Sequence, residues 1–136
     1  MITAVDTSVL LDVFTADPAF GQLSAETLRA CMLDGKLVAC EIVWAEISAS
    51  FLDSRAAEEA LKRIGVEFAP LDQISSLQAG LHWKKYRESG GKRTRIISDF
   101  LIGSHAHQQA DRLLTRDRGF YRKYFSRLRL IDPSIG

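Results

Sequence analysis

The first fourteen residues, MITAVDTSVLLDVF (residues 1–14), decide the fold. They open with a short apolar, partly β-branched run from Ile2 to Val5, which stops at Asp6. Such a run is typical of a strand buried on both faces in a parallel sheet. The segment carries Asp6 and Asp12 and has no basic leader, so it is interpreted as a first strand and not as a signal peptide.

Short apolar runs alternate with longer helical patterns along the rest of the chain. Strands are expected at residues 2–5, 36–40, 66–70, 112–115 and 128–131, and helices at about 17–33, 42–52, 54–64, 72–89 and 98–109. This alternation predicts an α/β fold, with a central parallel sheet of about five short strands and helices on both sides. A chain of 136 residues is expected to form a single domain over residues 1–136.

Composition limits the functional class. Hydrophobic residues make up 46% of the chain, which is enough for a core, yet no stretch approaches the roughly 18 apolar residues of a membrane helix. The two cysteines, Cys31 and Cys40, lie in apolar surroundings and favour reduced core thiols over a disulfide. These features predict a cytoplasmic protein that does not enter the membrane.

Charge is unevenly distributed along the chain. Residues 82–136 contain thirteen Lys or Arg against five Asp or Glu, whereas residues 1–81 contain five against twelve. The basic half can form a phosphate-binding face, or its charged residues can simply be the solvent-exposed faces of helices. Charge alone leaves both interpretations open.

Four acids are expected at one edge of the sheet. Asp6 ends the first strand and Asp117 lies two residues beyond the fourth, while Asp99 stands in the first turn of a helix. Glu46 lies on the same helix face as Ile42, in an apolar stripe where an acid is costly unless it is paired. Each acid alone could be a helix cap or a turn residue. Together they lie where the strands of an open α/β sheet end and where ligands bind.

Clustered carboxylates repel one another unless a cation compensates their charge. A site of oxygen ligands without Cys or His favours Mg²⁺, with Mn²⁺ as a substitute, over Zn²⁺. Such a site suits hydrolysis of a phosphodiester bond, because the ion stabilises the developing charge and activates water. The sequence leaves open whether one ion or two would bind.

The motifs in this order resemble those of the PIN-domain family. AVDTSVLLD (4–12) resembles its first motif, WAEIS (44–48) its second, and DFLIGSHAHQQADRLLTRDRGF (99–120) its third and fourth. The resemblance extends from Ile2 to about Ile131, and it is closest to the VapC-type toxins of VapBC toxin–antitoxin pairs. Gly103 departs from the pattern, since a small Ala is usual there.

The resemblance implies a Mg²⁺-dependent endoribonuclease, cytoplasmic and homodimeric, that is paired with a VapB-type antitoxin protein. Carried over by position, Asp6 and Asp99 are expected to be direct metal ligands. Glu46 and Asp117 are expected to complete the metal site and the catalytic quartet. Ser8 and Thr115 match the hydroxyl positions that hold the acids in place.

Basic and apolar residues near these acids are candidates for partner contacts. RNA contacts are expected from five basic residues, Lys92, Arg93, Arg95, Arg116 and Arg118. The antitoxin is expected on Phe51 and on the apolar face of the helix at residues 54–64.

Other functional classes remain as alternatives. A PIN nuclease of RNA processing without an antitoxin would share the same enzymology. A non-catalytic receiver-type signalling domain also binds Mg²⁺ at a sheet edge, but it needs an Asp at the end of its third strand, where this chain has VEFAP (66–70). A haloacid-dehalogenase-like phosphatase would need an Asp at the position of Ser8.

Overall fold

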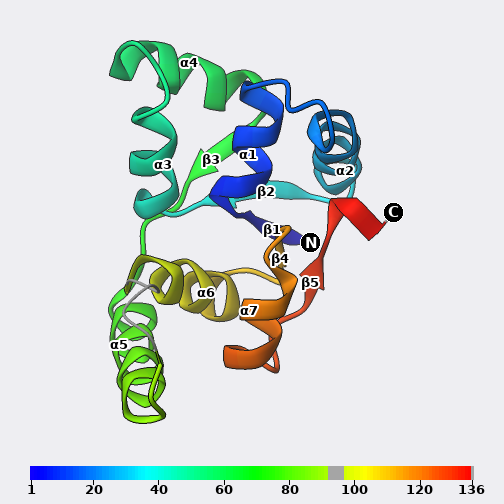
Figure 1. Ribbon diagram of the computed structural model, residues 1–136. Coiled ribbons are helices and arrows are strands. Elements are labelled where there is room, and N and C mark those ends of the chain that lie inside the picture. Colours follow the sequence, from blue (N-terminus) through cyan, green and yellow to red (C-terminus); the bar gives the residue numbers. More distant parts are fainter. Residues whose placement is uncertain (92–96, 136) are drawn as a thin grey trace.

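The computed structural model describes residues 1–91 and 97–135. The strands are β1 (Ile2–Val5), β2 (Lys36–Ala39), β3 (Val66–Phe68), β4 (Arg112–Leu114) and β5 (Leu130–Ile131). The helices are α1 (Thr7–Phe14), α2 (Gly21–Leu33), α3 (Glu41–Ser48), α4 (Ser54–Arg63), α5 (Gln73–Glu88), α6 (Ile97–Gln109) and α7 (Arg118–Tyr124), followed by a short 3₁₀ helix, η1 (Pro133–Ile135). Figure 1 shows these elements along the chain.

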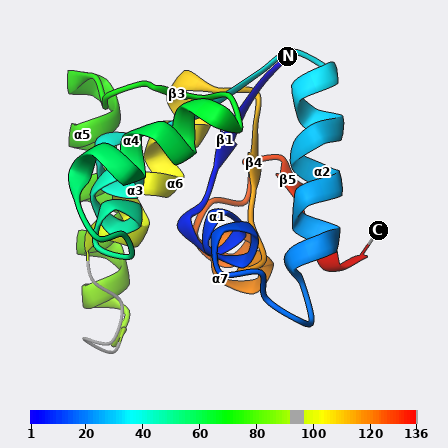
Figure 2. The ribbon, with the colours of Figure 1, turned by 90° about the horizontal axis from the view of Figure 1, so that it is seen from above.

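The five strands form one parallel sheet in the order β3-β2-β1-β4-β5. Helix α2 lies on one side of this sheet, and helices α3 to α6 lie on the other (Figure 2). The α/β fold predicted from the sequence is therefore confirmed. Because β1 lies at the centre, the strand order reverses between β1 and β4, which is where open α/β sheets bind their ligands.

The core is built from the apolar runs that predicted the strands and from one face of each covering helix. Leu37 of β2 and Leu113 of β4 are fully buried, as are Ile47 of α3, Leu61 of α4 and Phe100 of α6. Several helices begin at an acid, whose side chain accepts a bond from the first turn. Asp53 accepts from the Ala56 N–H at 2.8 Å, and Asp72 accepts from the Ser75 N–H at 2.7 Å.

Two short helices were not predicted, and one helix begins later than predicted. Helices α1 and α7 each lie soon after a strand, and their eight and seven residues give too few turns for a clear helical period. The Asp17–Pro18 pair forms a turn and not a helix start. Its Asp17 carboxylate accepts from the Ala19 and Phe20 N–H groups, and α2 begins at Gly21. Within the described ranges, no helix is long and apolar enough to cross a membrane.

Candidate active site

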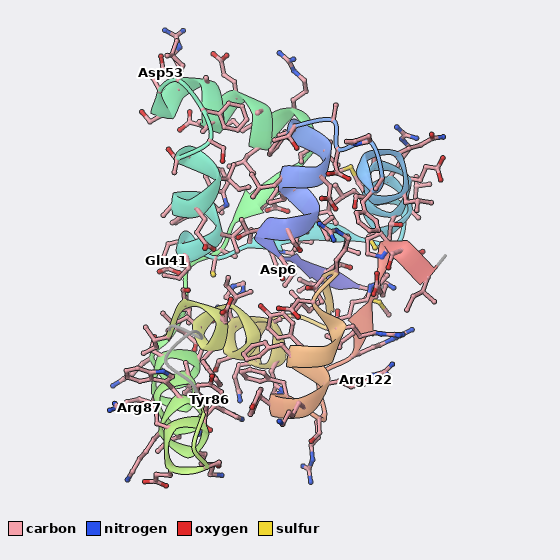
Figure 3. All side chains as sticks on the ribbon, in the orientation of Figure 1. Asp6, Glu41, Asp53, Tyr86, Arg87 and Arg122 are labelled. Carbon is pink, nitrogen blue, oxygen red and sulfur yellow. The ribbon has the colours of Figure 1, made fainter. Side chains whose placement is uncertain are left out.

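Asp6 lies at the centre of the molecule, where β1 ends and α1 begins (Figure 3). Its backbone N–H still pairs with the Leu114 carbonyl of β4 at 2.9 Å, so its place is fixed by the sheet. Each of its carboxylate oxygens accepts one bond, from the Thr7 N–H at 2.8 Å and from the Thr115 hydroxyl at 2.7 Å. Asp6 is therefore held firmly at the C-terminal edge of the sheet, as the sequence predicted.

The environment of Asp6 disfavours its charge. Burial raises the pKa of Asp6 from 3.8 to about 6, and only 7% of the residue is exposed. The hydrogen bonds from Thr115 and Thr7 oppose this rise, whereas the charges of Asp99 and Asp117 add to it. Three acids from β1, α6 and the end of β4 thus lie within electrostatic range of one another.

Thr115 connects two of these acids. Its hydroxyl donates to Asp6 Oδ2, and its oxygen accepts from the Asp117 backbone N–H at 2.9 Å. The Thr115 residue is fully buried, and its N–H pairs with the Ile131 carbonyl of β5 at 2.9 Å. One hydroxyl at the end of a central strand therefore sets the positions of Asp6 and Asp117 relative to each other.

Glu46 contacts the site from the exposed face of α3 and not from the predicted core-facing stripe. It is exposed and does not face the core, because Val43 and Ile47 supply the buried face of α3. Its carboxylate accepts from the Thr7 hydroxyl at 2.8 Å, and Thr7 is the neighbour of Asp6. The expectation that Glu46 belongs to a core-facing stripe was wrong, although the Thr7 contact brings Glu46 to the same edge.

A divalent metal ion can be tested against this arrangement. Among the described residues, no three acidic, histidine or cysteine side chains come close enough together to enclose an ion. Mg²⁺ does not need such a cage, since it keeps several waters and is commonly bound through one or two carboxylates. Asp6 is a buried acid whose ionised form is disfavoured by two neighbouring acids, and a cation would relieve this repulsion. The donors at this edge therefore fit a hard divalent ion.

The other predicted site residues have different outcomes. Ser8 Oγ is buried and has no hydrogen-bond partner among the described residues, so its predicted role in holding the acids stays a prediction. Arg118 is half-buried at the start of α7, beside Asp117. Lys92, Arg93 and Arg95 lie outside the described residues.

Arg116 has a partner within the protein. Its guanidinium binds both carboxylate oxygens of Asp12, at 2.6 and 2.9 Å, and lies 4.2 Å from the ring centre of Phe20. The bond to Asp12 raises the pKa of Arg116 above its ordinary value. This charge is therefore already compensated within the protein, and a contact of Arg116 with RNA stays a prediction.

Sequence reasoning missed two residues that bond to the site or to a residue next to it. Thr7 bonds to Asp6 through its N–H and to Glu46 through its hydroxyl. Asp12 binds Arg116, which is next to Thr115. The sequence does contain a signal for Thr7 in the Asp6-Thr7-Ser8 stretch. A hydroxyl in the first turn of a helix can form a hydrogen bond to a neighbouring element. For Asp12 the only signal is an acid inside the apolar run VLLDVF.

Comparison with solved structures shows which proteins share this fold. One match is VapBC2 from Rickettsia felis bound to a DNA fragment from its promoter, with a TM-score of 0.73 and 18% identity, covering 97% of this chain and 98% of that chain. Another is VapBC-1 from nontypeable Haemophilus influenzae, with a TM-score of 0.72 and 17% identity, covering 98% and 99%. FitAcB from Neisseria gonorrhoeae matches with a TM-score of 0.70 and 18% identity, covering 98% of each chain.

Comparison with curated protein sequences finds no match. The family model of the PIN domain, in contrast, matches residues 3–126. This range includes most of β1, all of β2 to β4 and α7, and all four acids of the predicted quartet. The chain belongs to the PIN-domain family.

Proposed function

We propose that the chain is a Mg²⁺-dependent endoribonuclease that hydrolyses RNA phosphodiester bonds and acts as the toxin of a type II toxin–antitoxin pair. PIN domains are nucleases, so hydrolysis of nucleic acid follows from the family. The observation that carries the rest is the buried Asp6 at the reversal of strand order, whose charge is opposed by Asp99 and Asp117.

Asp6 and Asp99 would hold the metal, with Glu46 and Asp117 completing the acidic surroundings. A bound divalent ion would stabilise negative charge on the phosphate and lower the pKa of the attacking water. The protein's own part is to keep Asp6 ionised and oriented. The Thr115 hydroxyl and the Thr7 N–H both favour the carboxylate form, and they fix the plane of the carboxylate.

RNA is proposed as the substrate because the basic half of the chain, residues 82–136, also supplies two of the four acids, Asp99 and Asp117. Arg118 begins α7 beside Asp117, and Arg122 and Lys123 lie in the last turn of the same helix. Cations at this position can bind phosphates on either side of the cleaved bond, through attraction that does not depend on base sequence. Lys92, Arg93 and Arg95 remain in the proposal as sequence-based candidates.

A VapB-type antitoxin is proposed as the partner, because several solved structures with this fold are described as VapBC, and another is described as a toxin–antitoxin complex from Klebsiella pneumoniae. A pocket of about 300 Å³ between α1, α2 and α4 is consistent with a protein partner. Its apolar wall includes Val13, Leu28 and Ile64, and Arg29 and Arg63 lie at its side. This combination suits an apolar side chain flanked by acids.

A cytoplasmic homodimer is also proposed. Helix α5 presents Ile74, Leu77 and Leu81 to solvent on one stripe, each more than half exposed. Two such helices packed antiparallel about a two-fold axis would bury both stripes. Light scattering of the purified chain measures this association.

The test of the nuclease is cleavage of single-stranded RNA, with single-stranded DNA of the same sequence in parallel. Wild-type protein is expected to cleave RNA with Mg²⁺ or Mn²⁺ and not with EDTA. Asp99→Asn should abolish cleavage and leave the protein folded. Asp53→Asn is a matched control, because it removes the same charge from a helix cap far from Asp6 (Figure 3), where Asn caps equally well. An Asp99→Asn protein with full activity would contradict the assignment.

A further inference from the structure

Asp12 is a buried acid outside the predicted quartet. Only 4% of it is exposed, and burial of a carboxylate is costly unless it is paired and hydrogen-bonded. Its partners meet this need. The Ser24 hydroxyl donates to Oδ2 at 2.9 Å, and Arg116 donates to both oxygens at 2.6 and 2.9 Å. A bidentate pair of this kind fixes the direction of the guanidinium as well as its distance.

Arg116 stands between two residues of the candidate active site. Thr115 bonds to Asp6, and Asp117 is one of the acids that oppose the charge of Asp6. Helix α1 therefore contacts the segment 115–117 at two points: at Asp6, which caps it, and at Asp12, about 9 Å further along its axis. The Arg116 guanidinium also lies 4.2 Å from the ring centre of Phe20, and 28% of the Arg116 side chain is exposed.

Asp117 is the last residue of this segment of the chain. It lies beyond the last strand pairing of β4, Leu114 with Ile131, and precedes the seven-residue α7. Its side chain makes no cap bond to α7. The backbone N–H of Asp117 donates to Thr115 Oγ1. This bond ties the backbone of Asp117 to Thr115, on the other side of Arg116.

We propose that Asp12 is a positioning residue of the candidate active site: by binding Arg116 it holds the segment that carries Asp117 against Asp6. This inference rests on the proposed function in one respect, that Asp117 serves the metal site. Asp12 itself does not touch the metal or the RNA. It acts from α1, through Arg116, on a residue more than one hundred positions away in the sequence.

The competing explanation is that the Asp12–Arg116 pair only stabilises the fold. Ser24→Ala separates the two explanations, because Ser24 is fully buried and bonds to the same carboxylate. This variant removes a buried partner of Asp12 and keeps the Arg116 contact. It should lower the melting temperature without changing the site. Asp12→Asn, in contrast, disrupts the bidentate contact at nearly constant volume.

The first measurement is hydrogen exchange of the Asp117 backbone amide without metal. In Asp12→Asn, the Asp117 amide should exchange faster than in the wild type when both rates are compared with those of the β1 amides. In Ser24→Ala, this relative rate should stay as in the wild type. Arg116→Lys provides a second variant that keeps the charge, loses the bidentate geometry and should show the same selective loss. Equal protection of the Asp117 amide in wild type and folded Asp12→Asn would overturn the proposal.

The second measurement is Mn²⁺ binding by calorimetry to the same folded proteins. Residues that orient metal ligands typically change metal affinity by about 10- to 100-fold, so Asp12→Asn should raise the Mn²⁺ dissociation constant at least about tenfold. Ser24→Ala should bind as the wild type does. Wild-type affinity in Asp12→Asn would overturn the positioning role. A wild-type protein that binds no Mn²⁺ would instead overturn the proposed function, and the exchange experiment would still decide whether Asp12 holds Asp117.

Discussion

Replacement of Asp6 by Asn should make the metal-free protein more stable at neutral pH and less stable in acid. Burial raises the pKa of Asp6 from 3.8 to about 6 in the folded protein, whereas in the unfolded chain it returns to its ordinary value. Below pH 3.8 Asp6 is protonated in both states, and its burial costs no ionisation energy. Between pH 3.8 and 6 the unfolded chain releases its proton more readily, so stability falls as pH rises.

The magnitude follows from the shift. At about 1.4 kcal/mol per pH unit, the wild-type protein loses about 3 kcal/mol of stability across this window. Asn at this position is uncharged at every pH, but it can accept only one of the two bonds that Asp6 accepts from Thr7 and Thr115. The lost bond costs about 1 kcal/mol. Asp6→Asn should therefore be about 1 kcal/mol less stable than wild type below pH 4 and about 2 kcal/mol more stable above pH 7.

The assay is urea unfolding of both proteins in EDTA at several pH values from 4 to 8. The decisive quantity is the difference between their free energies of unfolding, which should change sign within this range. A difference that does not vary with pH would refute the reasoning, because it would mean that Asp6 ionises as freely in the folded protein as in the unfolded chain. Added Mg²⁺ should then stabilise the wild type at pH 7 and leave Asp6→Asn unchanged.

Three further predictions concern the surroundings of the site and the core. Thr115→Val removes a hydrogen bond that lowers the pKa of Asp6, so this pKa should rise further. In the same urea assay, the loss of stability with rising pH should then extend to higher pH. The Asp6 carboxylate and the Asp117 N–H each lose a partner, which should lower the free energy of unfolding by about 1–3 kcal/mol. Gly103→Ala would place a Cβ 2.5 Å from the ring of the buried Phe125, so it should cost about 1–3 kcal/mol; a variant as stable as wild type would show that the ring moves freely. Burial raises the pKa of both cysteine thiols, so a thiol reagent should modify them only in denaturant, and rapid modification of the native protein would contradict their burial.

Much of the fold could be predicted because its signals are local. The strand cores are short apolar runs, and the ends of α2 and α4 follow from Gly35 and Gly65. Gly65 has a φ of +80°, a conformation that favours glycine over other residues. The positions of Asp6, Asp99 and Asp117 at one edge also follow from local signals, since parallel strands with right-handed crossovers share their C-terminal edge.

The remaining features depend on partners that lie far apart in the sequence. Asp12 and Arg116 are separated by 104 residues, and their contact requires β1 and β4 to be neighbours, which is known only once the strand order is known. Glu46 was assigned to the wrong face because the helix that carries it is only eight residues long. In a helix of about two turns, too few apolar residues are present to show which face is buried. The bond of Glu46 to Thr7 cannot be inferred from the spacing of residues either.

The central position of β1 has a consequence for the order in which the chain can become active. Within this domain β1 is synthesised first, and one of its two neighbours, β4, is synthesised more than one hundred residues later. Thr115 and Asp117 arrive with that strand, and Asp99 arrives shortly before it. A nascent chain therefore carries Asp6 and Glu46 before the residues that complete the site have been made. Closing a loop of this length is a late and entropically costly step of folding. Catalytic competence should consequently appear only when synthesis of the domain is nearly finished.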